Sequence, residues 1–234
     1  VIITTDVIND GRITTNATNI TGNITNNGNL IFNSGPTNNN VIIGTGEITI
    51  NALIINNNTI NNNITINSGK QLTTNATNIT GNITNNGNLV LNGGTNSNTI
   101  VGTGLIRVND NVINSGEINL SSITVLQGKE ITNQNKIDAY KYINNGTTVN
   151  NSTITIHGDF INNGLLTNTN LIETNKFTIT NNSAINNTGK IQTNILTIQE
   201  QSILDNADLN TFVILNSIEN NGDLVLGNGN IQNS

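Results

Sequence analysis

The seventeen residues TTNATNITGNITNNGNL occupy positions 14–30 and occur again, unchanged, at positions 73–89, which is 59 positions further along the chain. Within them, single apolar residues alternate with polar ones over short runs, and Asn and Gly separate the runs. Such alternation is typical of β-strands, and Asn/Gly clusters between the runs are typical of tight turns. The segment therefore predicts short strands joined by corners that recur in a fixed order.

The composition agrees with strands and disfavours helices. Of the 234 residues, 34% are hydrophobic, 3% aromatic and 9% charged, and the net charge is −6. Asn, Thr, Ile and Gly are weak helix formers, whereas Ile, the main apolar residue, fits a thin interior between flat walls. The eight basic residues are scattered, so no nucleic-acid partner is expected. No apolar run approaches the length of a membrane span, so none is expected.

A shorter period underlies the 59-residue repeat. The segments ITNNGNLIF (24–32) and ITNNGNLVL (83–91) share a template of apolar residue, corner and alternating apolar pair. Further matches recur with a period of about 29–30 residues, and they place corners at Gly28, Asn58, Gly87, Gly116, Gly146 and Asn175. The pattern predicts an all-β parallel β-solenoid, or β-helix, of about eight coils of about 29–30 residues. Each coil would hold three short strands, in a single Asn-rich domain over 1–234 without evident caps.

The residue types suit such a winding. Gly and Asn tolerate the positive φ that a tight corner often needs. Stacked corners would also place Asn above Asn, where side-chain amides form hydrogen-bonded ladders along the axis. An antiparallel β-sandwich explains the short strands but not the sustained period. The residues expected to stack in the core are Ile24, Leu30, Phe32, Ile54, Ile60, Ile83, Leu89 and Leu91.

The segments NITNNGNLVLNGG (82–94) and TIVGTGLIRV (99–108) resemble the Gly/Asn-punctuated repeats of bacterial autotransporter passenger domains and haemagglutinin-like secreted adhesins. The resemblance is one of repeat style over most of the chain. It implies an extracellular parallel β-helix that serves as a surface stalk, adhesin or self-associating fibre. It carries over no catalytic or binding residue.

Few residues of this sequence are candidates for catalysis or ligand binding. The single His, His157, is followed closely by Asp159, and Glu130 lies one predicted period before that Asp, so the two carboxylates would lie on adjacent coils. A solvated corner and a surface charge ladder are the expected roles of these residues. For stacking against a sugar the chain offers only Tyr140 and Tyr142, and no Trp. There is no Cys, and none of the common catalytic motifs occurs. We therefore expect no enzyme, catalytic residue, cofactor or metal site.

The expected function is that of a secreted structural protein at the cell surface or in a biofilm matrix. The strand pattern begins in VIITTDVIND and continues into the last residues without a visible cap, which suggests head-to-tail stacking with copies of the same chain. The main alternative is an adhesive module that is a segment of a longer autotransporter-type passenger and binds a host or neighbouring-cell glycan or protein. More distant alternatives are a polysaccharide-degrading β-helix enzyme and an ice-binding protein. Ice binding would need paired outward Thr on every coil, as in TTNAT at 14–18 and 73–77.

Overall fold

The computed structural model describes residues 2–180, 183–200, 203–206, 212–221, 223–226 and 232–233. These residues form β-strands and a single short 3-10 helix, η1 (Ala76–Asn78). The chain divides into two compact units, Val1–Leu120 and Ser121–Ser234. Among the described residues, no helix is long and apolar enough to cross a membrane. The expected single domain stays a prediction.

Most strands of the first unit are two to four residues long. They are β1 (Ile2–Ile3), β2 (Val7–Asn9), β3 (Arg12–Thr15), β4 (Asn19–Ile20), β5 (Ile24–Asn26), β6 (Asn29–Phe32), β7 (Thr37–Asn38), β8 (Ile42–Ile43), β9 (Glu47–Ile50), β10 (Leu53–Asn56), β11 (Asn63–Ile66), β12 (Gln71–Thr74), β13 (Ile83–Asn85), β14 (Asn88–Asn96), β15 (Thr99–Val101) and β16 (Leu105–Asn114). Strand β17 (Glu117–Val125) follows.

The second unit alternates long and short strands. They are β18 (Glu130–Asn133), β19 (Lys136–Asn144), β20 (Thr147–Asn150), β21 (Thr153–Asn162), β22 (Leu165–Asn168), β23 (Leu171–Ile179), β24 (Ala184–Asn187), β25 (Lys190–Ile198), β26 (Ile203–Asn206), β27 (Phe212–Asn220), β28 (Asp223–Leu226) and β29 (Gln232–Asn233).

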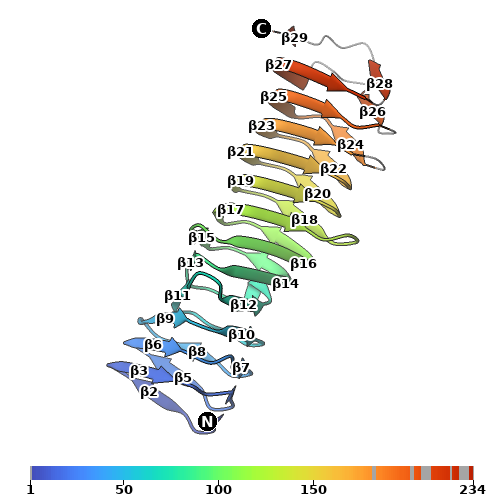
Figure 1. The fold of residues 1–234 in the computed structure, drawn as a ribbon. Helices are drawn as coiled ribbons and strands as arrows, with labels where there is room; N and C mark the ends of the chain where they lie inside the picture. Colours follow the sequence, from blue (N-terminus) through green and yellow to red (C-terminus); the bar gives the residue numbers. More distant parts are fainter. Residues whose placement is uncertain are drawn as a thin grey trace. The chain divides into compact units, whose positions relative to one another are not determined.

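The first unit winds as a coil with three sides, and each strand pairs in parallel with its equivalent one coil later. We call the sides face 1 (β3, β6, β9, β11, β13 and β15), face 2 (β1, β4, β7, β10, β12, the start of β14, and β16) and face 3 (β2, β5 and β8, continued by bridges at Ile60 and Ile79). Figure 1 shows these short strands lying one above the other. The predicted parallel β-solenoid is confirmed, with about 11 turns over the described residues.

The coil is shorter than the period of the sequence, so the predicted coil length is wrong. Arg12 lies opposite Asn29 and Asn29 opposite Glu47, and these coils are therefore 17 and 18 positions long. Each side takes about one third of a coil, and five sides together span one period of the sequence template. The template recurs on all three sides of the coil. The spacing of its copies in the sequence therefore does not give the number of residues in one coil. The number of coils rises accordingly, and three strands per coil is correct for most of the first unit but not for the second.

The second unit has the same coil but a different division of strands. Each long strand covers two sides and bends between them, and each short strand forms the third side. In β19 and β21, for example, the register shifts between Ala139 and Tyr142, at the bend. Lys136 lies opposite Thr153, and Thr153 opposite Leu171, so these coils are again 17 and 18 positions long.

All eight predicted core residues are buried, each no more than 3% exposed. They belong to several separate columns, however. Ile24 shares a column with Ile60 through Ile42. Leu30 shares one with Ile83, and Ile54 shares one with Leu89. Phe32 lies opposite Ile50, and Leu91 opposite Val108. The columns follow the shorter observed coil, so residues 17–19 positions apart lie above one another and not residues 29–30 positions apart.

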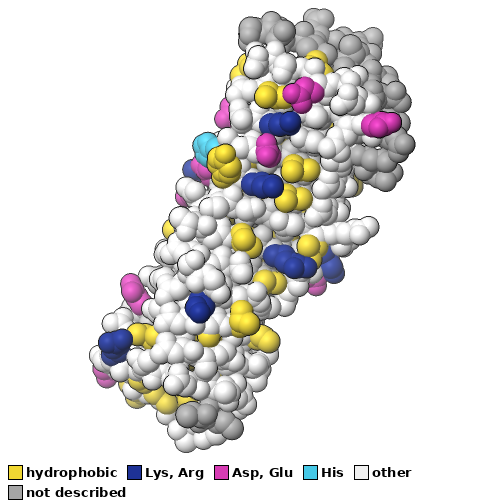
Figure 2. All heavy atoms as spheres, in the orientation of Figure 1, with side chains coloured by type: hydrophobic (Ala, Val, Ile, Leu, Met, Phe, Trp, Pro, Cys, Tyr) yellow, Lys and Arg dark blue, Asp and Glu magenta, His cyan; other side chains and the backbone are white. Residues whose placement is uncertain are grey.

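The surface is mostly neutral. In the face that Figure 2 shows, white side chains and backbone predominate, and charged side chains form separate spots. The two TTNAT segments lie on different sides, because Thr14 belongs to face 1 and Thr73 to face 2. They therefore do not combine into one Thr-rich face of the first unit.

Candidate functional site

Buried Asn side chains connect successive coils, as the ladder prediction requires. In the second unit, the last residues of four short strands, Asn133, Asn150, Asn168 and Asn187, stack in one column. Each Nδ2 donates to the Oδ1 of the next Asn, over 2.9, 2.7 and 2.7 Å. All four side chains are buried, at most 5% exposed. Shorter ladders join Asn9 to Asn26 and Asn38 to Asn56 in the first unit.

The ladder amides also satisfy the backbone at the corners. The Nδ2 of Asn150 donates to the carbonyl oxygen of Leu171 over 3.0 Å, where the next coil resumes after its corner. The Nδ2 of Asn168 likewise donates to the carbonyl of Asn170 over 3.0 Å. A corner leaves carbonyls that no strand partner can reach, and a buried carbonyl without a donor costs free energy. The inward Asn is therefore a structural device that closes each corner.

The six predicted corner residues all lie at corners or bends, but on different sides of the coil. Gly28 precedes β6 on face 1, Asn58 precedes the face 3 bridge at Ile60, and Gly87 precedes β14 on face 2. Gly116 precedes β17, Gly146 precedes β20, and Asn175 lies at the bend of β23.

The four glycines among these corners serve close packing and not positive φ. Among the described glycines, positive φ occurs at Gly44, Gly69, Gly93, Gly94, Gly102 and Gly128, none of which is a predicted corner. A Cβ at Gly28 would overlap the carbonyl oxygen of Gly11 in the preceding coil, and a Cβ at Gly87 would overlap that of Lys70. Backbones of successive coils approach too closely there for any side chain.

The bends of the long strands in the second unit bring together side chains that the sequence separates. Asp138, Thr155, Glu173 and Gln192 form one outward column, since each is the Cα partner of the next. Beside this column, at the bends, lie Tyr140, His157, Asn175 and Asn194. Polar and charged groups of successive coils thus lie side by side along this corner.

His157 lies at the bend of β21 with a largely exposed side chain, and it contacts a carboxylate of the preceding coil. Its Nε2 lies 2.8 Å from Oδ1 of Asp138, on the preceding coil. Asp159 instead lies beyond the bend of β21, opposite Lys176. Glu130 is on the short strand β18, a different side of the coil from Asp159, and its Oε1 accepts from Thr132 Oγ1 over 3.0 Å. Glu130 and Asp159 are therefore not a pair on adjacent coils.

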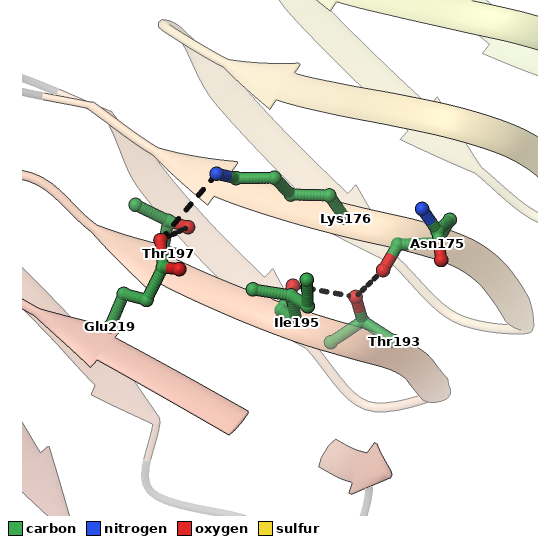
Figure 3. Close-up of polar contacts among 6 residues, drawn as sticks. All are labelled: Asn175, Lys176, Thr193, Ile195, Thr197 and Glu219. Carbon is green, nitrogen blue, oxygen red and sulfur yellow. Dashed lines mark hydrogen bonds and ion pairs between the residues drawn. The ribbon is translucent and has the colours of Figure 1, made fainter. Parts of the chain in front are cut away.

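Further along the same corner, hydroxyls and an ion pair connect three coils (Figure 3). The buried Thr193 Oγ1 lies 2.8 Å from the carbonyl oxygen of Ile195 and 3.3 Å from that of Asn175, so its one hydroxyl hydrogen is within reach of carbonyls at two bends. Lys176 Nζ lies 3.5 Å from Glu219 Oε2, which also accepts from Thr197 Oγ1 over 3.0 Å. Both charged groups are partly exposed, so the pair adds little stability.

Aromatic rings support this corner from inside. Tyr142 stacks on Phe160 with ring centroids 4.7 Å apart, and Phe160 contacts Phe177 at 5.0 Å. Tyr142 is fully buried, and its hydroxyl lies 3.0 Å from Thr148 Oγ1. Burial raises the pKa of Tyr142 well above its ordinary value of 10.0, so the hydroxyl stays protonated. Of the two tyrosines named from the sequence, only Tyr140 faces solvent.

The fold and the ladders define the class of the chain as an Asn-rich parallel β-solenoid. The chain matches no known protein-family model, and neither a curated protein nor a solved structure is significantly similar to it. The likeness to autotransporter passengers and secreted adhesins therefore stays one of repeat style. The site residues described above are assigned from the geometry of this chain alone.

Proposed function

We propose that this chain is an extracellular structural protein, a β-solenoid that self-associates by head-to-tail stacking in a surface fibre, matrix filament or adhesin stalk. In this proposal it is not an enzyme. Its principal partners are copies of itself, and the adhesive module for a host or neighbouring-cell ligand is the alternative.

The proposal rests on the stacking of identical residue types on successive coils. Asn lies above Asn in the ladder of Asn133, Asn150, Asn168 and Asn187, and Ile lies above Ile in the column of Ile24, Ile42 and Ile60. The two edges of each coil are therefore complementary to each other, which is the heterologous type of contact that head-to-tail stacking uses. Two copies of the chain can use the same parallel pairing, core contact and amide ladder that each copy uses internally.

The neutral surface is compatible with such an assembly. With 9% charged residues and a net charge of −6, copies repel one another only weakly at physiological salt. The extracellular location rests on the repeat style shared with secreted adhesins.

The test combines sedimentation velocity over a wide concentration range with electron microscopy and fibre diffraction of the purified chain. Head-to-tail stacking predicts filaments whose strands lie across the fibre axis, with a meridional reflection at about 4.8 Å. A monodisperse monomer at every concentration would contradict self-association. The extracellular assignment is tested separately, by protease accessibility of the protein on intact producing cells.

A further inference from the structure

A shallow groove runs along the corner of the second unit. Its volume is about 320 Å³, and its polar lining includes Thr155, His157, Glu173, Asn175, Gln192 and Asn194. These residues come from β21, β23 and β25, and Leu215 of β27 completes the lining. The groove therefore crosses four successive coils, and its lining combines hydroxyl and amide groups with one imidazole and one carboxylate.

An aromatic side chain lies beside this groove. Tyr140 is 66% exposed, the most exposed of the large apolar or aromatic side chains in the second unit's described part. Its ring lies against Gly158, where an added Cβ would stand 3.1 Å from Tyr140 Cε1. Gly158 directly follows His157, which lines the groove. The absence of a side chain at Gly158 lets the ring lie close to the sheet, where it forms an exposed platform.

Two polar groups in the groove have no partner among the described residues. The Glu173 carboxylate and the Gln192 amide lie on adjacent coils as Cα partners, both half-buried, and neither makes a hydrogen bond or ion pair within the described part of the chain. Asn194 is different, because its Nδ2 donates to Asn175 Oδ1 over 2.9 Å and is thereby held in place. A carboxylate and an amide side by side offer both acceptors and donors to a ligand.

These features favour a sugar polymer as the ligand. A pyranose ring has an apolar face that stacks on an aromatic ring, and its edge carries hydroxyls that pair with carboxylate and amide groups. Coils are about 4.8 Å apart, close to the length of one sugar in an extended chain, so equivalent groups on successive coils meet successive sugars. An anionic polymer is disfavoured, since Glu173 lies in the groove and His157 is paired with Asp138.

We propose that the groove binds an extended, neutral polysaccharide, with Tyr140 stacking on one sugar and Glu173 and Gln192 binding hydroxyls of its neighbours. This activity is independent of head-to-tail stacking, because the groove lies along the side of the coils. Binding without filaments, or filaments without binding, would therefore separate the two proposals.

The experiment is isothermal titration of the full chain with linear neutral hexasaccharides, namely cellohexaose, laminarihexaose, xylohexaose and mannohexaose. At least one should bind with saturation. Tyr140→Ala should then weaken binding about tenfold, whereas Tyr140→Phe, which keeps the ring, should stay within about threefold of the wild type. Glu173→Gln and Gln192→Ala should each weaken binding severalfold.

The matched control is Leu165→Ala, which removes an exposed side chain, 42% accessible, from the short strand β22 on another side of the coil. It should leave binding unchanged. Thermal unfolding of every variant checks that the solenoid remains folded. The proposal is overturned if no hexasaccharide saturates the chain at millimolar concentration, or if Tyr140→Ala binds as tightly as Leu165→Ala.

Discussion

Asn150 lies directly between Asn133 and Asn168, accepting at Oδ1 from Asn133 Nδ2 over 2.9 Å and donating from its own Nδ2 to Asn168 Oδ1 over 2.7 Å. The same Nδ2 reaches the carbonyl of Leu171. One amide therefore forms hydrogen bonds that connect three coils.

Replacing Asn150 with Leu tests what these hydrogen bonds contribute to stability. The change leaves Asn168 Oδ1 and the Leu171 carbonyl without this donor in a buried site, and each loss costs about 1–3 kcal/mol. We expect the free energy of unfolding in urea to fall by about 2–4 kcal/mol. The neighbouring, exposed Asn151 is the control, and Asn151→Ala should change it by less than about 0.5 kcal/mol. Equal effects of the two variants would show that the ladder adds no stability.

Gly28→Ala and Gly11→Ala test the reason for glycine at the corners. A methyl group at Gly28 would overlap the carbonyl of Gly11, so the coils must separate, and we expect a loss of about 1–3 kcal/mol. At Gly11 an added Cβ meets nothing within 4 Å. That variant should be neutral or stabilised by up to about 1 kcal/mol, because it restricts the unfolded chain. Thermal unfolding compares the two, and a Gly11→Ala loss as large as that of Gly28→Ala would contradict the explanation.

Phe160→Ala tests the aromatic stack beneath the groove. Phe160 is fully buried between Tyr142 and Phe177, and the lost packing and the cavity should cost about 3–5 kcal/mol. Tyr140→Ala removes an exposed ring from the neighbouring bend and should cost less than about 1 kcal/mol. Urea unfolding followed by circular dichroism measures both. A small effect of Phe160→Ala would show that the stack is loosely packed.

The buried Tyr142 predicts how stability depends on alkaline pH. Its pKa in the folded chain is raised above the ordinary value of 10.0, so the folded state holds the proton more tightly than the unfolded state does. This contribution is fully present below about pH 10 and is lost as the pH rises towards the higher folded value. The free energy of unfolding should therefore fall above pH 10 more steeply in the wild type than in Tyr142→Phe. If the free energy of unfolding fell equally steeply with pH in the two proteins, this prediction would be wrong.

The sequence predicted the fold class well because the solenoid is built from local rules. Alternation along ITNNGNLIF places Ile24, Leu30 and Phe32 inward, and the Asn and Gly that follow each run mark corners. The coil length could not be predicted in the same way. The template recurs on every side of the coil, so the sequence looks equally regular whether one coil contains three sides or five. Only the pairing of strands between coils shows that the chain returns to the same side after three.

The candidate groove depended on that same coil length. Residues about one observed coil apart become neighbours, which brings His157 to Asp138 and Glu173 to Gln192. With the longer period of the sequence template, Asp159 and Glu130 were the expected neighbours instead. The exposure of Tyr140 and the burial of Tyr142, on either side of Lys141, follow from the bend in β19.

The sequence by itself thus determined the strands, the corners, the inward apolar residues and the stacking of Asn, because each depends on a few neighbouring residues and their conformational preferences. The tertiary structure alone decided the length of the coil, the membership of each column and the groups that meet at the bends. These depend on which backbone groups pair between coils, and that choice is made by the packing of all three sides around one core.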